Sequence, residues 1–165
     1  MKRDLASAFL KVTRHFGLEP DQGSSRPLHI LVVDDEESVR RFVKRVLTEA
    51  GCHITIAGDG DEALAVAAHL DAIDMLVTDL MMPHMNGDEL ARRLRARHPD
   101  LAVLYLTGFS DRLFAERLTL WEHEAFLDKP CSIVGLKEAV SLLVTGHVTV
   151  GTAPDGSRPA SERAS

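Results

Sequence analysis

The feature that most constrains the fold is a strict alternation between short apolar segments and longer amphipathic ones. Each of five apolar segments of strand length is followed by a segment with helical periodicity. The predicted strands cover 28–33, 53–58, 74–79, 101–108 and 124–129, and the predicted helices cover 36–51, 60–70, 87–98, 110–120 and 131–144. Because the central strands are almost entirely apolar, we expect an α/β fold in which helices cover both faces of one open parallel sheet.

The chain of 165 residues has room for one such domain, predicted at 28–145, and short appendages. Residues 1–19 are predicted to form an amphipathic helix that packs on the domain or pairs two chains. Its apolar residues recur at helical spacing: Leu5, Phe9, Val12 and Phe16. Residues 20–27, rich in Pro, Gly and Ser, indicate a linker, and 146–165 are expected to be a disordered tail.

Charge and cysteine content exclude several classes of protein. A net charge of -6 argues against direct nucleic-acid binding, and no apolar stretch approaches the roughly 20 residues of a membrane span. Cys52 and Cys131 form no disulfide framework, and no signal peptide is evident, so we expect a cytoplasmic protein. Cys131 is expected to begin the last helix, with a redox role as the less favoured alternative.

Polar residues follow the predicted strands at their carboxyl ends, where ligands bind in open parallel sheets. These residues are Asp34 and Asp35 after the first strand, Asp79 at the third, Thr107 at the fourth and Lys129 at the fifth. The second strand ends only in Ala57 and Gly58, which suggests that it lies to one side. Taken one at a time, these residues also suit helix caps, turns or solvent-exposed positions. Because four different strands place acids, a hydroxyl and an ammonium group at the same edge of the sheet, a ligand-binding site is the better interpretation.

The chemistry of this set indicates a phosphoryl-transfer site. Carboxylates at about 4 Å repel by about 4 kcal/mol at an effective dielectric of ~20, so the three acids need a cation. Carboxylate and backbone oxygens suit Mg²⁺ where a phosphate completes the coordination shell. Asp79 is then a candidate nucleophile that forms an aspartyl phosphate, while Lys129 and Thr107 contact the phosphoryl oxygens.

Four stretches carry a family resemblance: "LVVDDEESVRR", "VTDLMMPHMNGDEL", "LYLTG" and "FLDKP". In order and spacing they resemble the receiver domain of two-component response regulators, from about Leu28 to Val144. The resemblance implies that Asp79 is the phosphoacceptor. It implies that Asp35 binds Mg²⁺ directly, Asp34 through water and Met81 through its backbone carbonyl, with Mn²⁺ able to substitute.

The resemblance also implies how such a site switches. Thr107 is the expected switch hydroxyl, Lys129 the phosphate contact, and Phe126 the aromatic switch position. The Lys129–Pro130 bond is expected to be cis. The fold implied is flavodoxin-like, with strand order 2-1-3-4-5.

The expected output surface is the fourth predicted helix, the fifth strand and the fifth helix, roughly 110–144, with Trp121 as a reporter of activation. The expected donor is a sensor histidine kinase or a His-containing phosphotransfer protein, and the expected receiver of the signal is a downstream protein effector or the next member of a phosphorelay. We also consider a homodimer through this surface or through the N-terminal helix. The chain is expected to be of the stand-alone type and to catalyse only its own phosphorylation and dephosphorylation. Apolar Met81 and Phe109 predict a slow to moderate loss of the phosphoryl group.

Three alternatives are weighed against this interpretation. A phosphatase of the haloacid dehalogenase type needs a second acid two residues after the nucleophile, where this chain has Met81. A flavodoxin-like cofactor binder needs a phosphate-binding loop in place of the acidic "DDEES". A degenerate receiver that acts only as a scaffold would not need the complete set of acids together with Thr107 and Lys129.

Overall fold

The computed structural model describes residues 26–108 and 123–145. Several predictions lie outside these residues and are not tested by the structure: the N-terminal helix, most of the linker, the fourth predicted helix with Phe109 and Trp121, and the tail. Among the described helices, none is long and apolar enough to cross a membrane.

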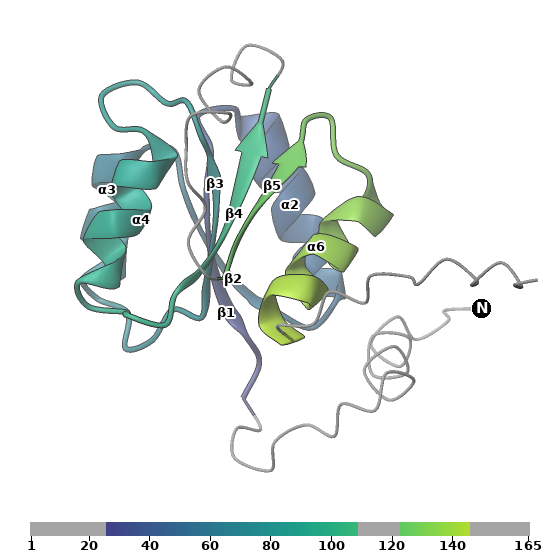
Figure 1. Cartoon of the computed structure of the whole chain (residues 1–165), viewed down its shortest axis with the longest axis horizontal. Coiled ribbons are helices and arrows are strands. Elements are labelled where there is room, and N and C mark those ends of the chain that lie inside the picture. Colours follow the sequence, from purple (N-terminus) through teal and green to yellow (C-terminus); the bar gives the residue numbers. More distant parts are fainter. Residues whose placement is uncertain (1–25, 109–122, 146–165) are drawn as a thin grey trace, which may run out of the picture.

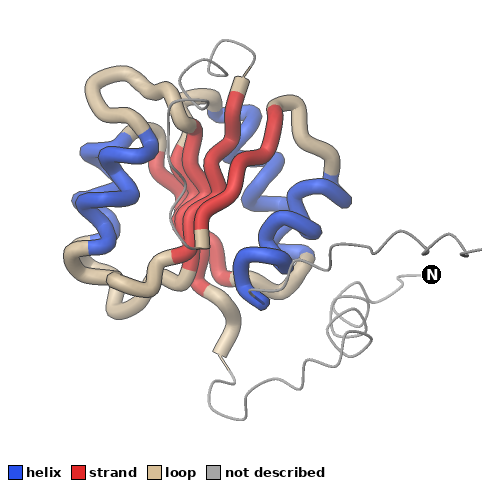
Figure 2. The backbone as a smooth tube through the Cα atoms, in the orientation of Figure 1, coloured by secondary structure: helices blue, strands red, loops and turns tan. Residues whose placement is uncertain are grey.

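Five parallel strands form a single sheet (Figures 1 and 2). They are β1 (His29–Val33), β2 (His53–Ala57), β3 (Met75–Asp79), β4 (Ala102–Thr107) and β5 (Glu124–Asp128). The strand order is β2-β1-β3-β4-β5, which confirms the predicted order and the position of β2 at one side. From β1 the next strand, β2, is added on one side, whereas β3 and the later strands are added on the other, so the strand order reverses between β1 and β3, the place where open α/β sheets bind ligands.

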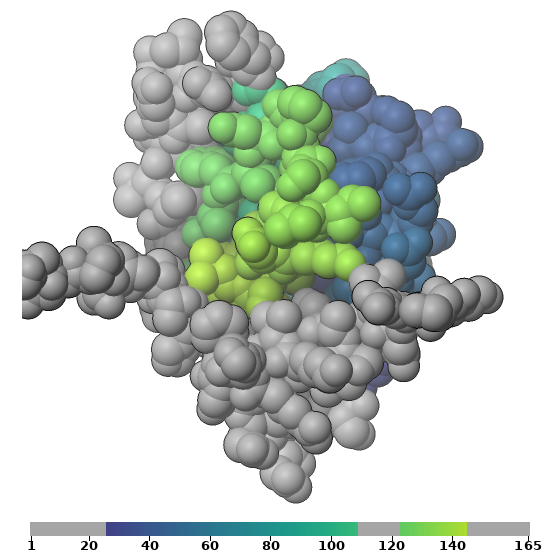
Figure 3. Space-filling model, turned by 90° about the vertical axis from the view of Figure 1, so that its right-hand side faces the viewer, coloured from purple at the N-terminus to yellow at the C-terminus, as the bar shows by residue number. Residues whose placement is uncertain are grey.

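Helices cover both faces of the sheet, as predicted (Figure 1). On one face lie α2 (Glu37–Glu49) and α6 (Ile133–Thr145), and on the other lie α3 (Gly60–Ala67) and α4 (Gly87–Arg95). The space-filling view shows α6 beside α2 (Figure 3). The helix α2 forms here because its residues Val43, Val46 and Leu47 recur on one side and bury that side against the sheet.

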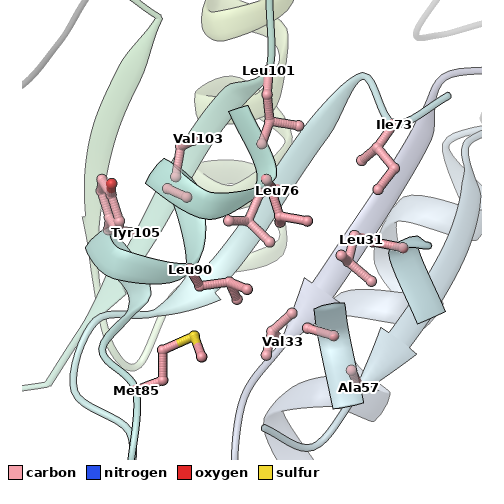
Figure 4. Close-up of a cluster of buried hydrophobic side chains, with 14 of the residues drawn as sticks. Leu31, Val33, Ala57, Ile73, Leu76, Met85, Leu90, Leu101, Val103 and Tyr105 are labelled. Carbon is pink, nitrogen blue, oxygen red and sulfur yellow. The ribbon is translucent and has the colours of Figure 1, made fainter. Parts of the chain in front are cut away.

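The alternation of side chains along the strands divides the core into two layers. In β1, Leu31 and Val33 face the layer under α3 and α4, while Ile30 and Val32 face the layer under α2 and α6. Figure 4 shows the first of these layers. Because both layers are closed by helices, every residue of β3 is buried, and the polar residues that matter for function lie at the strand ends.

The last helix begins later than predicted. Cys131 does not start α6, which begins at Ile133. The reason is a cap: the Ser132 hydroxyl accepts a hydrogen bond from the Gly135 N–H at 2.9 Å, which makes Ser132 the residue that precedes the helix. Burial also raises the pKa of the Cys131 thiol, which argues against the redox alternative.

Candidate functional site

Three carboxylates meet at the carboxyl edge of β1 and β3. Asp34 and Asp35 follow β1, and Asp79 is the last residue of β3. Each offers an oxygen that lies within 4.8 Å of the other two. Asp34 and Asp79 are buried, whereas Asp35 is exposed. The structure thus brings Asp79 next to two acids that precede it by 44 and 45 positions in the sequence, and it leaves one of these, Asp35, open to solvent.

Lys129 supplies the positive charge next to these acids. Its Nζ lies 2.8 Å from Asp34 Oδ2, 3.6 Å from Asp79 Oδ2 and 3.8 Å from Glu36 Oε1. Burial alone would lower the pKa of Lys129, but the hydrogen bond and charge of Asp34, and then the charge of Asp79, raise it. Lys129 therefore carries a full charge at neutral pH and pairs most closely with Asp34.

Asp34 is held by the fold at both of its carboxylate oxygens. Its Oδ1 accepts a hydrogen bond from the Glu36 N–H at 2.8 Å, and its Oδ2 faces Lys129. Burial nevertheless raises the pKa of the Asp34 carboxyl, with a further contribution from the charge of Asp35. The ionised site is therefore short of positive charge even with Lys129 in place.

The donor set fits a hard divalent cation. Three carboxylates and one ammonium leave an excess negative charge of about two at this edge, and carboxylate oxygens are the ligands that Mg²⁺ prefers. The difference in exposure also fits, since a magnesium ion retains several waters and needs one side open to solvent.

Thr107 lies at the same edge but its hydroxyl points elsewhere. The Thr107 hydroxyl donates to Asp128 Oδ1 at 3.0 Å, between residues in register on β4 and β5. The main-chain carbonyl of Thr107 accepts from the Lys129 N–H at 2.8 Å, which fixes the backbone of Lys129 beside the acids. Asp128, which sequence reasoning did not single out, is therefore the partner of the proposed switch hydroxyl in this structure.

Phe126 is separate from the acids and belongs to an aromatic pair. Its ring centroid lies 5.4 Å from that of Tyr105, the residue in register on β4. The Tyr105 hydroxyl donates to Glu124 Oε1 at 3.2 Å, and Arg95 at the end of α4 pairs with the same oxygen at 2.6 Å. Burial, followed by the charge of Glu124, raises the pKa of Tyr105. Sequence reasoning missed this network, because Tyr105 resembles an ordinary apolar strand residue.

The loop after Asp79 returns tightly onto its own strand. The Gly87 N–H donates to the Leu80 carbonyl at 2.9 Å. A Cβ on Gly87 would overlap the main-chain carbonyl of Asp79, so only glycine fits at this first position of α4. Within this loop, the side chain of Met81 is exposed. On the β5 side of the site, the Lys129–Pro130 peptide bond is cis, as predicted.

Comparisons with known proteins identify the family. The family model described as "Response regulator receiver domain" matches residues 30–141. The chain is 36% identical over 112 residues to a sensor kinase CckA from Brucella abortus, covering 67% of this chain and 12% of that protein. It is 32% identical over 123 residues to response regulator RR06 from Streptococcus pneumoniae, covering 74% of this chain and 56% of that protein.

Solved structures agree with the sequence matches. A response regulator receiver domain protein from Clostridium thermocellum superimposes with a TM-score of 0.62 and 28% identity, over 72% of this chain and 95% of that one. The chain spans 12% and 56% of the length of these two curated relatives. With five parallel strands in the order seen here and the family match over 30–141, the chain belongs to the response regulator receiver domain family.

Proposed function

We propose that Asp79 accepts a phosphoryl group and that this modification controls binding to a protein partner. The observation that carries the proposal is the position of Asp79: a buried strand-end carboxylate, grouped with Asp34 and Asp35 and 3.6 Å from Lys129. In the reaction a carboxylate oxygen of Asp79 attacks phosphorus, and the bond between phosphorus and the donor breaks, with its electron pair leaving on the donor.

Asp34, Asp35, Asp79 and the backbone carbonyl of Met81 would hold Mg²⁺, with Mn²⁺ as a substitute. When bound, the ion neutralises charge on the phosphoryl oxygens during transfer. The protein contributes orientation: the Glu36 N–H and Lys129 fix Asp34. Exposed Asp35 leaves the open side through which a donor reaches Asp79.

Phosphorylation would offer new partners to two residues. Lys129, already 3.6 Å from Asp79, would contact a phosphoryl oxygen. The Thr107 hydroxyl would leave Asp128 and turn toward the phosphoryl group, which would alter the space around Phe126. A ligand shifts such an equilibrium only through contacts that differ between the two states, and these contacts satisfy that condition. The surface affected comprises β5, α6 and the fourth predicted helix.

The partners follow from this chemistry. The phosphoryl donor would be a sensor histidine kinase or a His-containing phosphotransfer protein, and the output a protein effector or a further phosphorelay step. The same proposal includes a domain at 28–145, a cytoplasmic location and a slow to moderate loss of the phosphoryl group. It also includes a homodimer, through the predicted N-terminal helix or through the surface of the fourth predicted helix, β5 and α6. Beyond its own phosphorylation and dephosphorylation, no turnover is proposed.

The test is chemical labelling of the full chain. Acetyl phosphate and Mg²⁺ should add one phosphoryl group by intact mass, and excess EDTA should prevent it. Asp79→Asn should abolish the addition, whereas Asp61→Asn, an exposed acid in the first turn of α3, should leave it unchanged. A label that persists in Asp79→Asn, or no label on the wild type with any small phosphodonor, would refute the proposal.

A further inference from the structure

Arg40 makes a contact that neither the family match nor the proposed chemistry uses. It lies on α2, and its Nη1 donates a hydrogen bond to the main-chain carbonyl of Asp34 at 2.5 Å. That carbonyl belongs to the peptide unit that joins Asp34 to Asp35. Arg40 itself is held by the helix, since its N–H donates to the Glu36 carbonyl at 3.1 Å.

The guanidinium group also lies against the turn between β2 and α3. A Cβ built on Gly58 would be 3.6 Å from Arg40 Nη1 and 3.3 Å from Glu62 Oε2. The Gly58 N–H donates to the same Glu62 oxygen at 2.7 Å. A Cβ at Gly58 would therefore press first on Glu62 and would be in ordinary van der Waals contact with Arg40, which lies between the loop after β1 and the turn after β2.

We propose that Arg40 is a positioning residue for the metal site. Asp34 is fixed through its own side chain, but Asp35 is exposed and depends on its backbone for direction. By holding the Asp34 carbonyl, Arg40 sets the orientation of the next peptide unit and so the direction in which the Asp35 carboxylate points. This inference rests on the proposed function to the extent that both require a divalent cation at the three acids.

Two effects of Arg40 on cation affinity have opposite signs, which makes the inference testable. As a positive charge near the site, Arg40 disfavours the binding of a cation, so its removal would strengthen binding if charge alone mattered. As a positioning group, it favours binding, so its removal would weaken it. Loss of groups that orient metal ligands typically weakens affinity about 10–100-fold, which exceeds the effect of one screened charge.

The experiment is a titration of the full chain with Mn²⁺, followed by electron paramagnetic resonance of the unbound ion, and with Mg²⁺ by calorimetry. Arg40→Met should bind both ions about tenfold more weakly than the wild type. Arg41→Met is the matched control: the adjacent arginine is exposed and pairs with Glu37, so its loss removes the same charge without touching Asp34. It should bind the ions as tightly as the wild type or slightly more tightly.

Two further variants separate position from charge and from folding. Arg40→Lys keeps the charge but loses the planar donor group, and should be weakened less than Arg40→Met. Gly58→Val keeps every charge but adds two methyl groups beyond a Cβ that would already lie 3.6 Å from Arg40 Nη1, so we expect it to crowd the guanidinium and to weaken binding in the same direction as Arg40→Met. Thermal unfolding in EDTA checks that each variant is folded, and Arg40→Lys decides the question if Arg40→Met does not fold.

The outcomes are distinguishable from those of the proposed function. Binding to Arg40→Met that is equal to or tighter than wild type, while wild type binds and is phosphorylated, would overturn the positioning role alone. Absence of Mn²⁺ and Mg²⁺ binding to the wild type would overturn both.

Discussion

Replacing Lys129 with methionine should expose how much the acid site depends on one cation. At an effective dielectric of ~20, an ammonium 2.8 Å from Asp34 attracts it by about 6 kcal/mol, and one 3.6 Å from Asp79 by about 5 kcal/mol. The cost of burying Lys129 offsets a large part of this attraction. Removing one partner from a buried ion pair lowers the free energy of unfolding by about 3–5 kcal/mol, and we expect a loss of about 3–4 kcal/mol at pH 7 without metal.

The loss should depend on pH, because the variant can relieve the repulsion by taking up a proton. Protonating a carboxyl of ordinary pKa 3.8 costs about 4.4 kcal/mol at pH 7 but only about 1.6 kcal/mol at pH 5, which sets an upper limit on the destabilisation at each pH. A carboxyl whose pKa is raised in the folded state favours folding below its ordinary pKa, and that advantage is lost as the pH rises through the folded value. Burial already raises the pKa of Asp34, and removal of Lys129 should raise it further, so the difference between wild type and variant should widen from pH 5 to pH 7.

The measurement is urea denaturation followed by circular dichroism, in EDTA at both pH values and then with Mg²⁺ at pH 7. Added Mg²⁺ should restore part of the lost stability, since a bound cation replaces the missing charge. Lys44→Met, which removes an exposed lysine of α2, should change the free energy of unfolding by less than about 0.5 kcal/mol. An equal loss at pH 5 and pH 7 for Lys129→Met would refute the electrostatic reasoning.

Three further substitutions test other contacts. Gly87→Ala should lower the free energy of unfolding by about 1–3 kcal/mol, because its Cβ meets the carbonyl at the end of β3; an unchanged melting temperature would contradict this. Tyr105→Phe should cost about 1 kcal/mol at pH 7 through the lost hydrogen bond to Glu124. Because burial and Glu124 raise the Tyr105 pKa, wild-type stability should fall as the pH passes the ordinary value of 10.0, and urea midpoints of the variant should fall less. By urea denaturation, Asp74→Asn should lower the free energy of unfolding by about 0.5–1 kcal/mol at pH 7 and by little near pH 2. Burial acts to raise the pKa of Asp74, but the hydrogen bonds from Arg26 and from a backbone N–H outweigh it and lower the pKa. The stabilisation that Asp74 contributes is therefore lost as the pH falls through the lowered pKa.

The order of the strands and the edge that carries the site were predictable from the sequence. The apolar segments have strand length, and polar residues follow four of the five, so the position of Asp79 beside Asp34 follows from the geometry of a parallel sheet. The cis Lys129–Pro130 bond was expected from the resemblance. These features depend on local pattern and chain order, which the sequence contains.

Pairings between side chains were not predictable in the same way. The sequence places Lys129 and Thr107 at the correct edge, but it does not say that Lys129 lies closer to Asp34 than to Asp79, or that Thr107 bonds to Asp128. Such choices depend on differences of about an ångström set by strand register and rotamers. Arg40 was also missed, because its contact with the backbone has no counterpart in any residue pattern.

The hydrogen bond between Thr107 and Asp128 has a consequence for the balance between resting and active forms. Its acceptor is an exposed carboxylate, so when the hydroxyl departs, water can take its place at a net cost of about 0.5–1.5 kcal/mol. That cost corresponds to a population ratio of about 2 to 13, small enough for a single new contact at a phosphorylated Asp79 to reverse it. Under the proposed function, the hydrogen bond that favours the unphosphorylated conformation is therefore weak, and phosphorylation of Asp79 suffices to shift the population to the other conformation.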